Sequence, residues 1–154
     1  MTTTNPTQQQ LADCDRIFHE WDRFAREGDV QRLLALYAEE AVFESPLVPA
    51  ILDEKSSGVL RGHREILPFI EEGTKRRPNE LVRWYRTGQY FTDGTTLIWE
   101  YPRETPDGDQ IGLIEVMEIR DGHIQHHRIY WDWKGCLQIS PSLVRTADAL
   151  ENAE

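Results

Sequence analysis

Apolar residues recur every three or four positions in the first part of the chain, the spacing that gathers them on one side of an α-helix. The pattern predicts a helix from Gln8 to Glu27, and Gly28 follows it as a helix-ending glycine. Asp29 is suited to cap a second, shorter helix, which carries Tyr37 on its apolar face and is expected to finish near residues 39–40. The chain therefore opens with two helices in tandem.

The middle of the chain is less regular. Ala41–Ser45 has the length of a short strand. The apolar stretch from Pro46 to Gly58 follows neither the helical period nor the alternation of a strand. A long apolar loop is often a lid or a pocket wall, and a loop simply packed on the core is the alternative. A third helix is predicted from Gly62 to about Thr74, with a kink or a break at Pro68, because proline has no backbone N–H to donate.

Strand-like runs, separated by short breaks, replace the helical period in the last third. Strands are predicted at Glu80–Gln89, Tyr90–Arg103, Ile111–Arg120 and His123–Trp133, and Asp-Gly pairs in this region are typical of tight hairpin turns. Helices followed by a run of neighbouring strands indicate the α+β class. We expect a cone-shaped α+β barrel, in which three N-terminal helices pack on a curved antiparallel sheet and the open end of the cone forms a small-molecule pocket.

Length and charge narrow the possible functions. The 154 residues suffice for one domain with a core but are few for two, and the net charge of −10 argues against nucleic acid as a partner. No apolar run approaches the roughly 18 residues that a membrane span needs. Residues 1–10 are polar and are expected to form a disordered leader rather than an export signal, so a cytoplasmic protein is expected.

Neither the thiols nor the imidazoles suggest a metal or redox site. Cys14 and Cys136 are far apart and outside any CxxC motif, so two idle thiols are favoured over a disulfide. The five histidines show neither the HxH nor the HExxH spacing of metal ligands, and the adjacent His126 and His127 would point to opposite faces of a strand. No metal and no cofactor are expected.

Three segments resemble a known family. They are Gly28–Pro46, with its Leu36-Tyr37-Ala38-Glu39-Glu40-Ala41-Val42-Phe43 core, then Leu60–Ile66 and Asp121–Asp132. They are similar to the SnoaL-like branch of the nuclear transport factor 2-like superfamily, which includes ketosteroid isomerases, polyketide cyclases and limonene epoxide hydrolases. The resemblance assigns residues 11–137 to a SnoaL-like domain and 138–154 to a C-terminal tail or short helix. It specifies a fold that hosts enzymes and binding modules alike.

The family's catalytic positions are only partly kept. The ketosteroid isomerase base resembles Ser45 here, its oxyanion-binding tyrosine resembles Trp21, and its protonated aspartate resembles Glu115. The carboxylate that cyclases and epoxide hydrolases carry on the final strand resembles Ile129. For epoxide hydrolases, the first-strand tyrosine and asparagine resemble Phe43 and Ser45, and the Arg/Asp pair falls around Glu100 to Pro102. The known constellations are therefore not reproduced.

Side-chain alternation suggests a different constellation. It directs Glu100, Glu115 and His127 into the cone, where a desolvated carboxyl beside a histidine could exchange protons near neutral pH. These three residues are the predicted catalytic groups. The predicted substrate-binding residues are mainly aromatic or apolar: Trp21, Tyr37, Phe43, Ser45, Ile129 and Trp131.

The sequence thus favours a SnoaL-like enzyme that performs cofactor-free acid/base chemistry, as a cyclase, isomerase or dehydratase, on a hydrophobic oxygenated small molecule. A non-catalytic ligand-binding or dimerisation module of the same fold is the main alternative, and an interaction domain of a larger assembly is a third. In this superfamily the convex sheet face usually carries the dimer contact, so the resemblance implies a homodimer through His126, Arg128, Tyr130 and Asp132.

Overall fold

The computed structural model describes residues 5–76, 89–104 and 110–152. In chain order these form α1 (Gln8–Glu27), α2 (Val30–Leu34), β1 (Tyr37–Glu44), α3 (Val48–Ile51), β2 (Val59–Arg61), α4 (Gly62–Arg76), β3 (Phe91–Thr92), β4 (Thr96–Glu104), β5 (Gln110–Arg120), β6 (His123–Trp131) and α6 (Trp133–Glu151). The predicted strand Glu80–Gln89 falls almost entirely outside the described residues.

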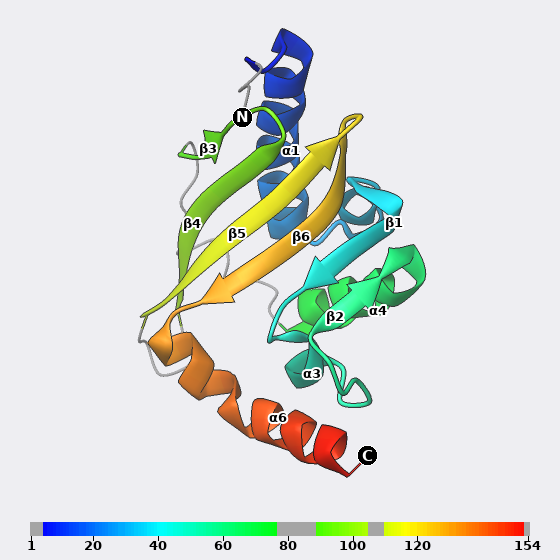
Figure 1. The fold of residues 1–154 in the computed structure, drawn as a ribbon, viewed down its shortest axis with the longest axis vertical. Coiled ribbons are helices and arrows are strands. Elements are labelled where there is room, and N and C mark those ends of the chain that lie inside the picture. The colour runs from blue at the N-terminus through cyan, green and yellow to red at the C-terminus, as the bar shows by residue number, and fades with distance from the viewer. Residues whose placement is uncertain (1–4, 77–88, 105–109, 153–154) are drawn as a thin grey trace.

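The core of the fold is a six-stranded sheet in the order β2-β1-β6-β5-β4-β3. The meander β4-β5-β6 is antiparallel, as the hairpin signals predicted, but β1 pairs in parallel with β6. The sheet is therefore mixed rather than antiparallel throughout. Figure 1 shows α1 lying behind the strands β4 to β6, and α4 lying behind β1 and β2. The prediction of an α+β fold with helices packed against a curved sheet is confirmed.

The first helix forms as its sequence predicts. Thr7 accepts the N–H of Gln10, and the Gln10 side chain accepts the N–H of Thr7 in return, so the two residues form a capping box. Gly28 ends the helix in the left-handed conformation, which glycine adopts without steric cost. The buried face carries Cys14, Ile17, Phe18, Trp21 and Phe24, which anchor the helix on the sheet.

The second helix is shorter than predicted. It stops at Leu34, and Tyr37, expected on its apolar face, is the first residue of β1. The reason is tertiary: the N–H of Ile124 donates to the carbonyl of Leu36, which draws this segment into the sheet beside β6. Strand pairing has overridden the local helical pattern.

The stretch from Pro46 to Gly58 is packed on the core, which was one of the two expectations. It holds the short helix α3, whose Val48 and Ile51 are buried, and it contacts the core. Helix α4 is not broken at Pro68. Pro68 has no N–H to donate to the carbonyl of Arg64, and both residues are exposed.

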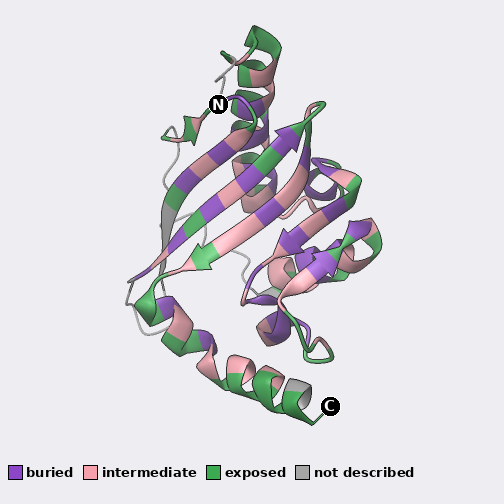
Figure 2. Cartoon of the chain, in the orientation of Figure 1, coloured by how far each residue is buried: buried purple, intermediate pink, exposed green. Residues whose placement is uncertain are grey.

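The C-terminal helix is longer than the segment Pro141–Leu150 predicted from sequence, since α6 begins at Trp133. Its inner side buries Ile139, whereas Trp133, Leu137 and Val144 are exposed. Figure 2 shows this contrast, with buried and exposed bands alternating along the sheet strands and mostly exposed or intermediate residues along the far part of α6. Within the described residues, no helix is both long and apolar enough to cross a membrane.

Candidate functional site

A chain of hydrogen bonds runs through the core from α1 to β5. The indole N–H of Trp21 donates to the Tyr37 hydroxyl over 3.1 Å, and that hydroxyl lies 2.8 Å from Nδ1 of His127. On the other side of the imidazole, Nε2 of His127 is hydrogen-bonded to Oε2 of Glu115. All four residues are buried, and His127 and Glu115 have no exposed surface at all. Polar groups this deep are costly unless paired, so the chain is a specific feature of the fold.

Strand register explains how the members of the chain meet. His127 on β6 lies opposite Phe43 on β1 and Met117 on β5, while Glu115 lies two residues from Met117 along β5, opposite Ile129. The pairing of β1 with β6 slips between Tyr37 and Val42. This irregularity places Tyr37 beside Ile124, from where its ring extends along the sheet to His127.

Proton positions in the chain are limited by donor chemistry. An indole N–H can only donate, so Trp21 occupies one lone pair of the Tyr37 oxygen. Tyr37 can then donate its hydrogen to Nδ1 of His127 while Nε2–H donates to the Glu115 carboxylate. Alternatively, Nδ1–H can donate to Tyr37, whose own hydrogen is then directed elsewhere. The arrangement can therefore pass a proton in either direction between Tyr37 and His127.

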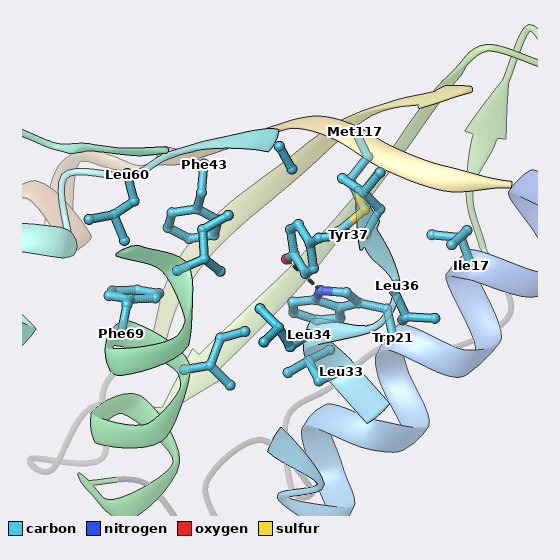
Figure 3. Close-up of a cluster of buried hydrophobic side chains, with 14 of the residues drawn as sticks. Ile17, Trp21, Leu33, Leu34, Leu36, Tyr37, Phe43, Leu60, Phe69 and Met117 are labelled. Carbon is cyan, nitrogen blue, oxygen red and sulfur yellow. Dashed lines mark hydrogen bonds between the residues drawn. The ribbon is translucent and has the colours of Figure 1, made fainter. Parts of the chain in front are cut away.

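Tyr37 links this chain to a cavity of about 300 Å³. The cavity wall is mainly apolar and aromatic, with a few polar groups from the ends of α1 and α4: Trp21, Ala25, Arg26, Glu27, Gly28, Leu33, Tyr37, Phe43, Leu47, Ile51, Phe69, Ile70, Gly73, Thr74, Leu113, Ile129 and Trp131. Figure 3 shows Tyr37 and Trp21 in the middle of the surrounding apolar side chains, with Phe43 and Phe69 nearby. Of the four residues in the chain, Trp21 and Tyr37 line the cavity and His127 and Glu115 do not, so a ligand would reach the imidazole and the carboxyl through Tyr37.

The environment keeps Tyr37 protonated. Burial raises the pKa of its phenol far above the ordinary value, the N–H of Trp21 opposes this effect, and the charge of Glu115 adds to it. A phenolate at this position is thus strongly disfavoured. Tyr37 can exchange a proton with a ligand only if another proton moves to or from its oxygen at the same time.

Most of the site residues predicted from sequence come together. Trp21, Tyr37, Phe43, Ile129 and Trp131 all line the cavity. Glu115 and His127 are hydrogen-bonded to each other directly behind it. Their catalytic and binding roles remain predictions.

Two predicted site residues lie elsewhere. Glu100 is exposed, because Leu97 and Trp99 are the buried residues of β4 and alternation turns Glu100 outward, beside Ile114. The expectation that it faces the cone is wrong by one residue of register. Ser45 is buried, but its hydroxyl accepts the N–H of Leu47 and caps a turn, and it lies outside the cavity.

The sequence placed Tyr37 in the pocket wall but missed its place in the proton chain. The sequence pattern placed Tyr37 on a helix. The register shift in β1 that brings Tyr37 to His127 cannot be recognised from the residues around it. Among the described residues, no group of three or more His, Cys, Asp or Glu side chains is placed as metal ligands would be.

Comparison with known families agrees with this architecture. Residues 15–127 match the model of the SnoaL-like domain. The chain belongs to this family. No curated protein sequence matches it. The SnoaL-like match begins within α1 and ends at His127 in the middle of β6, and so includes all four members of the hydrogen-bonded chain.

Solved structures share the SnoaL-like fold at low sequence identity. A SnoaL-like protein of unknown function from Burkholderia thailandensis is 18% identical, with a TM-score of 0.62 over 84% of this chain and 99% of the other. An NTF2-like protein from Anabaena variabilis is 15% identical, with a TM-score of 0.66 over 88% of this chain and 98% of the other. A candidate ketosteroid isomerase from Kribbella flavida is 15% identical, with a TM-score of 0.58 over 79% of this chain and 78% of the other. At these identities the likeness establishes the fold.

Proposed function

We propose that the protein is a small SnoaL-like enzyme that moves protons on a hydrophobic, oxygenated small molecule without a cofactor, as an isomerase, dehydratase or cyclase. The observation that carries the proposal is the hydrogen-bonded chain Tyr37–His127–Glu115, which ends at the wall of an apolar cavity. A neighbour of the same fold is described as a candidate ketosteroid isomerase, in keeping with this class of reaction.

The geometry supports the following proton path. A proton leaves an acidic C–H or O–H of the ligand for the Tyr37 oxygen as the original hydroxyl hydrogen passes to Nδ1 of His127. The result is a ligand anion, a neutral tyrosine and an imidazolium held against the Glu115 carboxylate. The reverse transfer returns the proton at a different ligand atom. Since Tyr37 is neutral before and after each transfer, its raised pKa does not obstruct the step.

This path suits reactions that consume no net proton. Enolisation, loss of a hydroxyl group β to a carbonyl and aldol-type ring closure each need a proton removed at one atom and supplied at another. The apolar wall favours a hydrophobic ligand, because burial of apolar surface is the main source of affinity in such cavities.

The test is solvent-deuterium exchange into enolisable cyclic ketones and their hydroxylated analogues, followed by NMR. It needs no knowledge of the final product. Wild-type protein should catalyse exchange, and Tyr37→Phe should lower the rate by about 10²–10⁴-fold, the usual contribution of a positioned acid or base. Tyr130→Phe makes the same chemical change at an exposed tyrosine and should leave the rate unchanged.

The alternative is a non-catalytic binding module of the same fold. It predicts that apolar ligands bind saturably without exchange, and that Tyr37→Phe weakens binding by no more than one hydrogen bond, about 1 kcal/mol. Saturable binding of such ketones with no detectable exchange would therefore replace the enzymatic proposal with this one.

A further inference from the structure

Trp21 contacts both proton-carrying residues of the chain. Its indole N–H donates to the Tyr37 hydroxyl oxygen, and its ring meets the His127 imidazole edge-on, with centroids 5.9 Å apart and planes at 86°. Trp21 is 8% exposed, so water does not compete freely for this hydrogen bond.

The tyrosine oxygen is the atom at which charge develops during the proposed transfer. Because an imidazole nitrogen is a far stronger base than a phenol oxygen, the hydroxyl proton leaves toward His127 ahead of the proton that arrives from the ligand, and the oxygen carries partial negative charge in the transition state. A fixed N–H dipole aimed at such an atom stabilises the transition state more than the ground state, and it requires no reorganisation.

We infer that Trp21 is a positioning residue of the reaction: its N–H fixes the Tyr37 oxygen between His127 and the cavity and stabilises the charge that develops there. The inference rests on the proton-transfer role proposed for Tyr37. It assigns Trp21 an electrostatic task in addition to its place in the core and the cavity wall.

Trp21 also restricts what Tyr37 can do. A hydroxyl group has one hydrogen and two lone pairs, and the Trp21 N–H occupies one lone pair. Only the hydrogen and the second lone pair remain, to be divided between His127 and a ligand. Whenever Tyr37 donates to His127 it can only accept from the ligand, and whenever it accepts from His127 it can only donate. Trp21 thereby makes Tyr37 an obligatory relay.

The first test measures the acidity of residue 37 without a ligand. Tyr37 is replaced by 3,5-difluorotyrosine, whose lower intrinsic pKa makes ionisation accessible, and its fluorine resonance is titrated against pH. Trp21→Phe removes the N–H and should make the phenol about tenfold less acidic, a rise of about one pH unit in the midpoint. Trp99→Phe is the matched control, since Trp99 is also buried and its ring centroid lies 5.6 Å from that of Trp21.

The inference is supported if Trp21→Phe raises the midpoint and Trp99→Phe does not. It is overturned if both variants raise it equally, which would indicate general loosening of the core, or if neither does. Should Trp21→Phe fold poorly, Trp21→benzothienylalanine keeps the size of the ring and removes only the donor, and the same two outcomes apply.

A second readout uses the exchange assay. Trp21→Phe should lower the rate at saturating ligand by about tenfold and change the half-saturating concentration by less than about twofold. An increase in the half-saturating concentration alone would reduce Trp21 to a wall residue. Absence of exchange in the wild-type protein would contradict the proposed function, while the fluorine titration would still decide whether Trp21 acts on Tyr37.

Discussion

The Tyr37 hydroxyl lies 2.8 Å from Nδ1 of His127, although 90 positions separate the two residues in the chain. Tyr37 faces the cavity and His127 lies behind it, so their contact joins a space that can hold a ligand to the most deeply buried polar pair of the described core.

The Glu115–His127 pair should behave as one energetic unit. Glu115→Met or His127→Leu alone leaves a buried polar partner unpaired and should lower the free energy of unfolding by about 1–3 kcal/mol. The double variant should cost less than the sum of the single variants, because it leaves neither group unpaired. Urea denaturation of the four proteins measures the coupling, and strictly additive losses would contradict it. Glu100→Met, at an exposed site, should change stability by less than about 0.5 kcal/mol.

Alkaline pH should destabilise the protein through Tyr37. Because burial raises the pKa of this phenol in the folded state, its contribution to stability is complete below the ordinary tyrosine pKa of about 10. Above that value the unfolded chain loses the proton and the folded chain keeps it, so stability falls as pH rises toward the folded-state pKa. The slope from this residue approaches about 1.4 kcal/mol per pH unit. The free energy of unfolding is measured by denaturation at several pH values above 10. Its decrease with pH should be less steep by this amount in Tyr37→Phe than in the wild-type protein, and identical slopes would contradict the prediction.

Gly58 should tolerate no side chain. A Cβ at this position would lie 2.8 Å from the carbonyl oxygen of Ser45, a backbone atom held in place where β1 meets β2. Gly58→Ala should therefore lower the free energy of unfolding by about 1–3 kcal/mol. Gly73, in α4, meets nothing within 4 Å, so Gly73→Ala should raise stability by up to about 1 kcal/mol. Thermal melts compare the two, and equal effects would refute the steric explanation.

The homodimer implied by the family resemblance remains a prediction, and the outer face of the sheet offers a means to test it. Ile114 and Tyr130 lie opposite each other on β5 and β6 and are 42% and 55% exposed, next to the Arg128–Glu118 ion pair. Such a mixture of apolar groups and both charge signs can be self-complementary about a two-fold axis. Ile114→Asp should shift sedimentation toward the monomer, whereas Phe91→Asp, on the far edge strand, should not. A wild-type monomer at all concentrations would exclude this interface.

Local patterns predicted the elements whose neighbours are close in sequence. The period of α1, its glycine stop and the alternation of β5 and β6 were sufficient to place Trp21, Glu115 and His127 on the inner side of the fold. Glu100 was misplaced because strand parity on β4 depends on where pairing with β5 begins. Tyr37 was assigned to a helix because only Ala41–Ser45 was predicted as a strand, and the partner of the first residue of β1 lies near the C-terminus. Part of the site's residues could be predicted from sequence, but the hydrogen bonds between them depend on the register of strands that are far apart in the chain.

The parallel pairing of β1 with β6 has a consequence for the order of folding. During synthesis, α1 and β1 leave the ribosome long before β6. Tyr37 and Trp21 therefore lack His127 and Glu115 as partners until nearly the whole chain has been synthesised. Contacts between such distant segments carry a large loop-closure cost and form late. A chain truncated before His123 should therefore hold an unpaired, aggregation-prone β1 edge. Completion of the proton relay then coincides with completion of the fold, so incompletely folded chains should carry out no proton transfer.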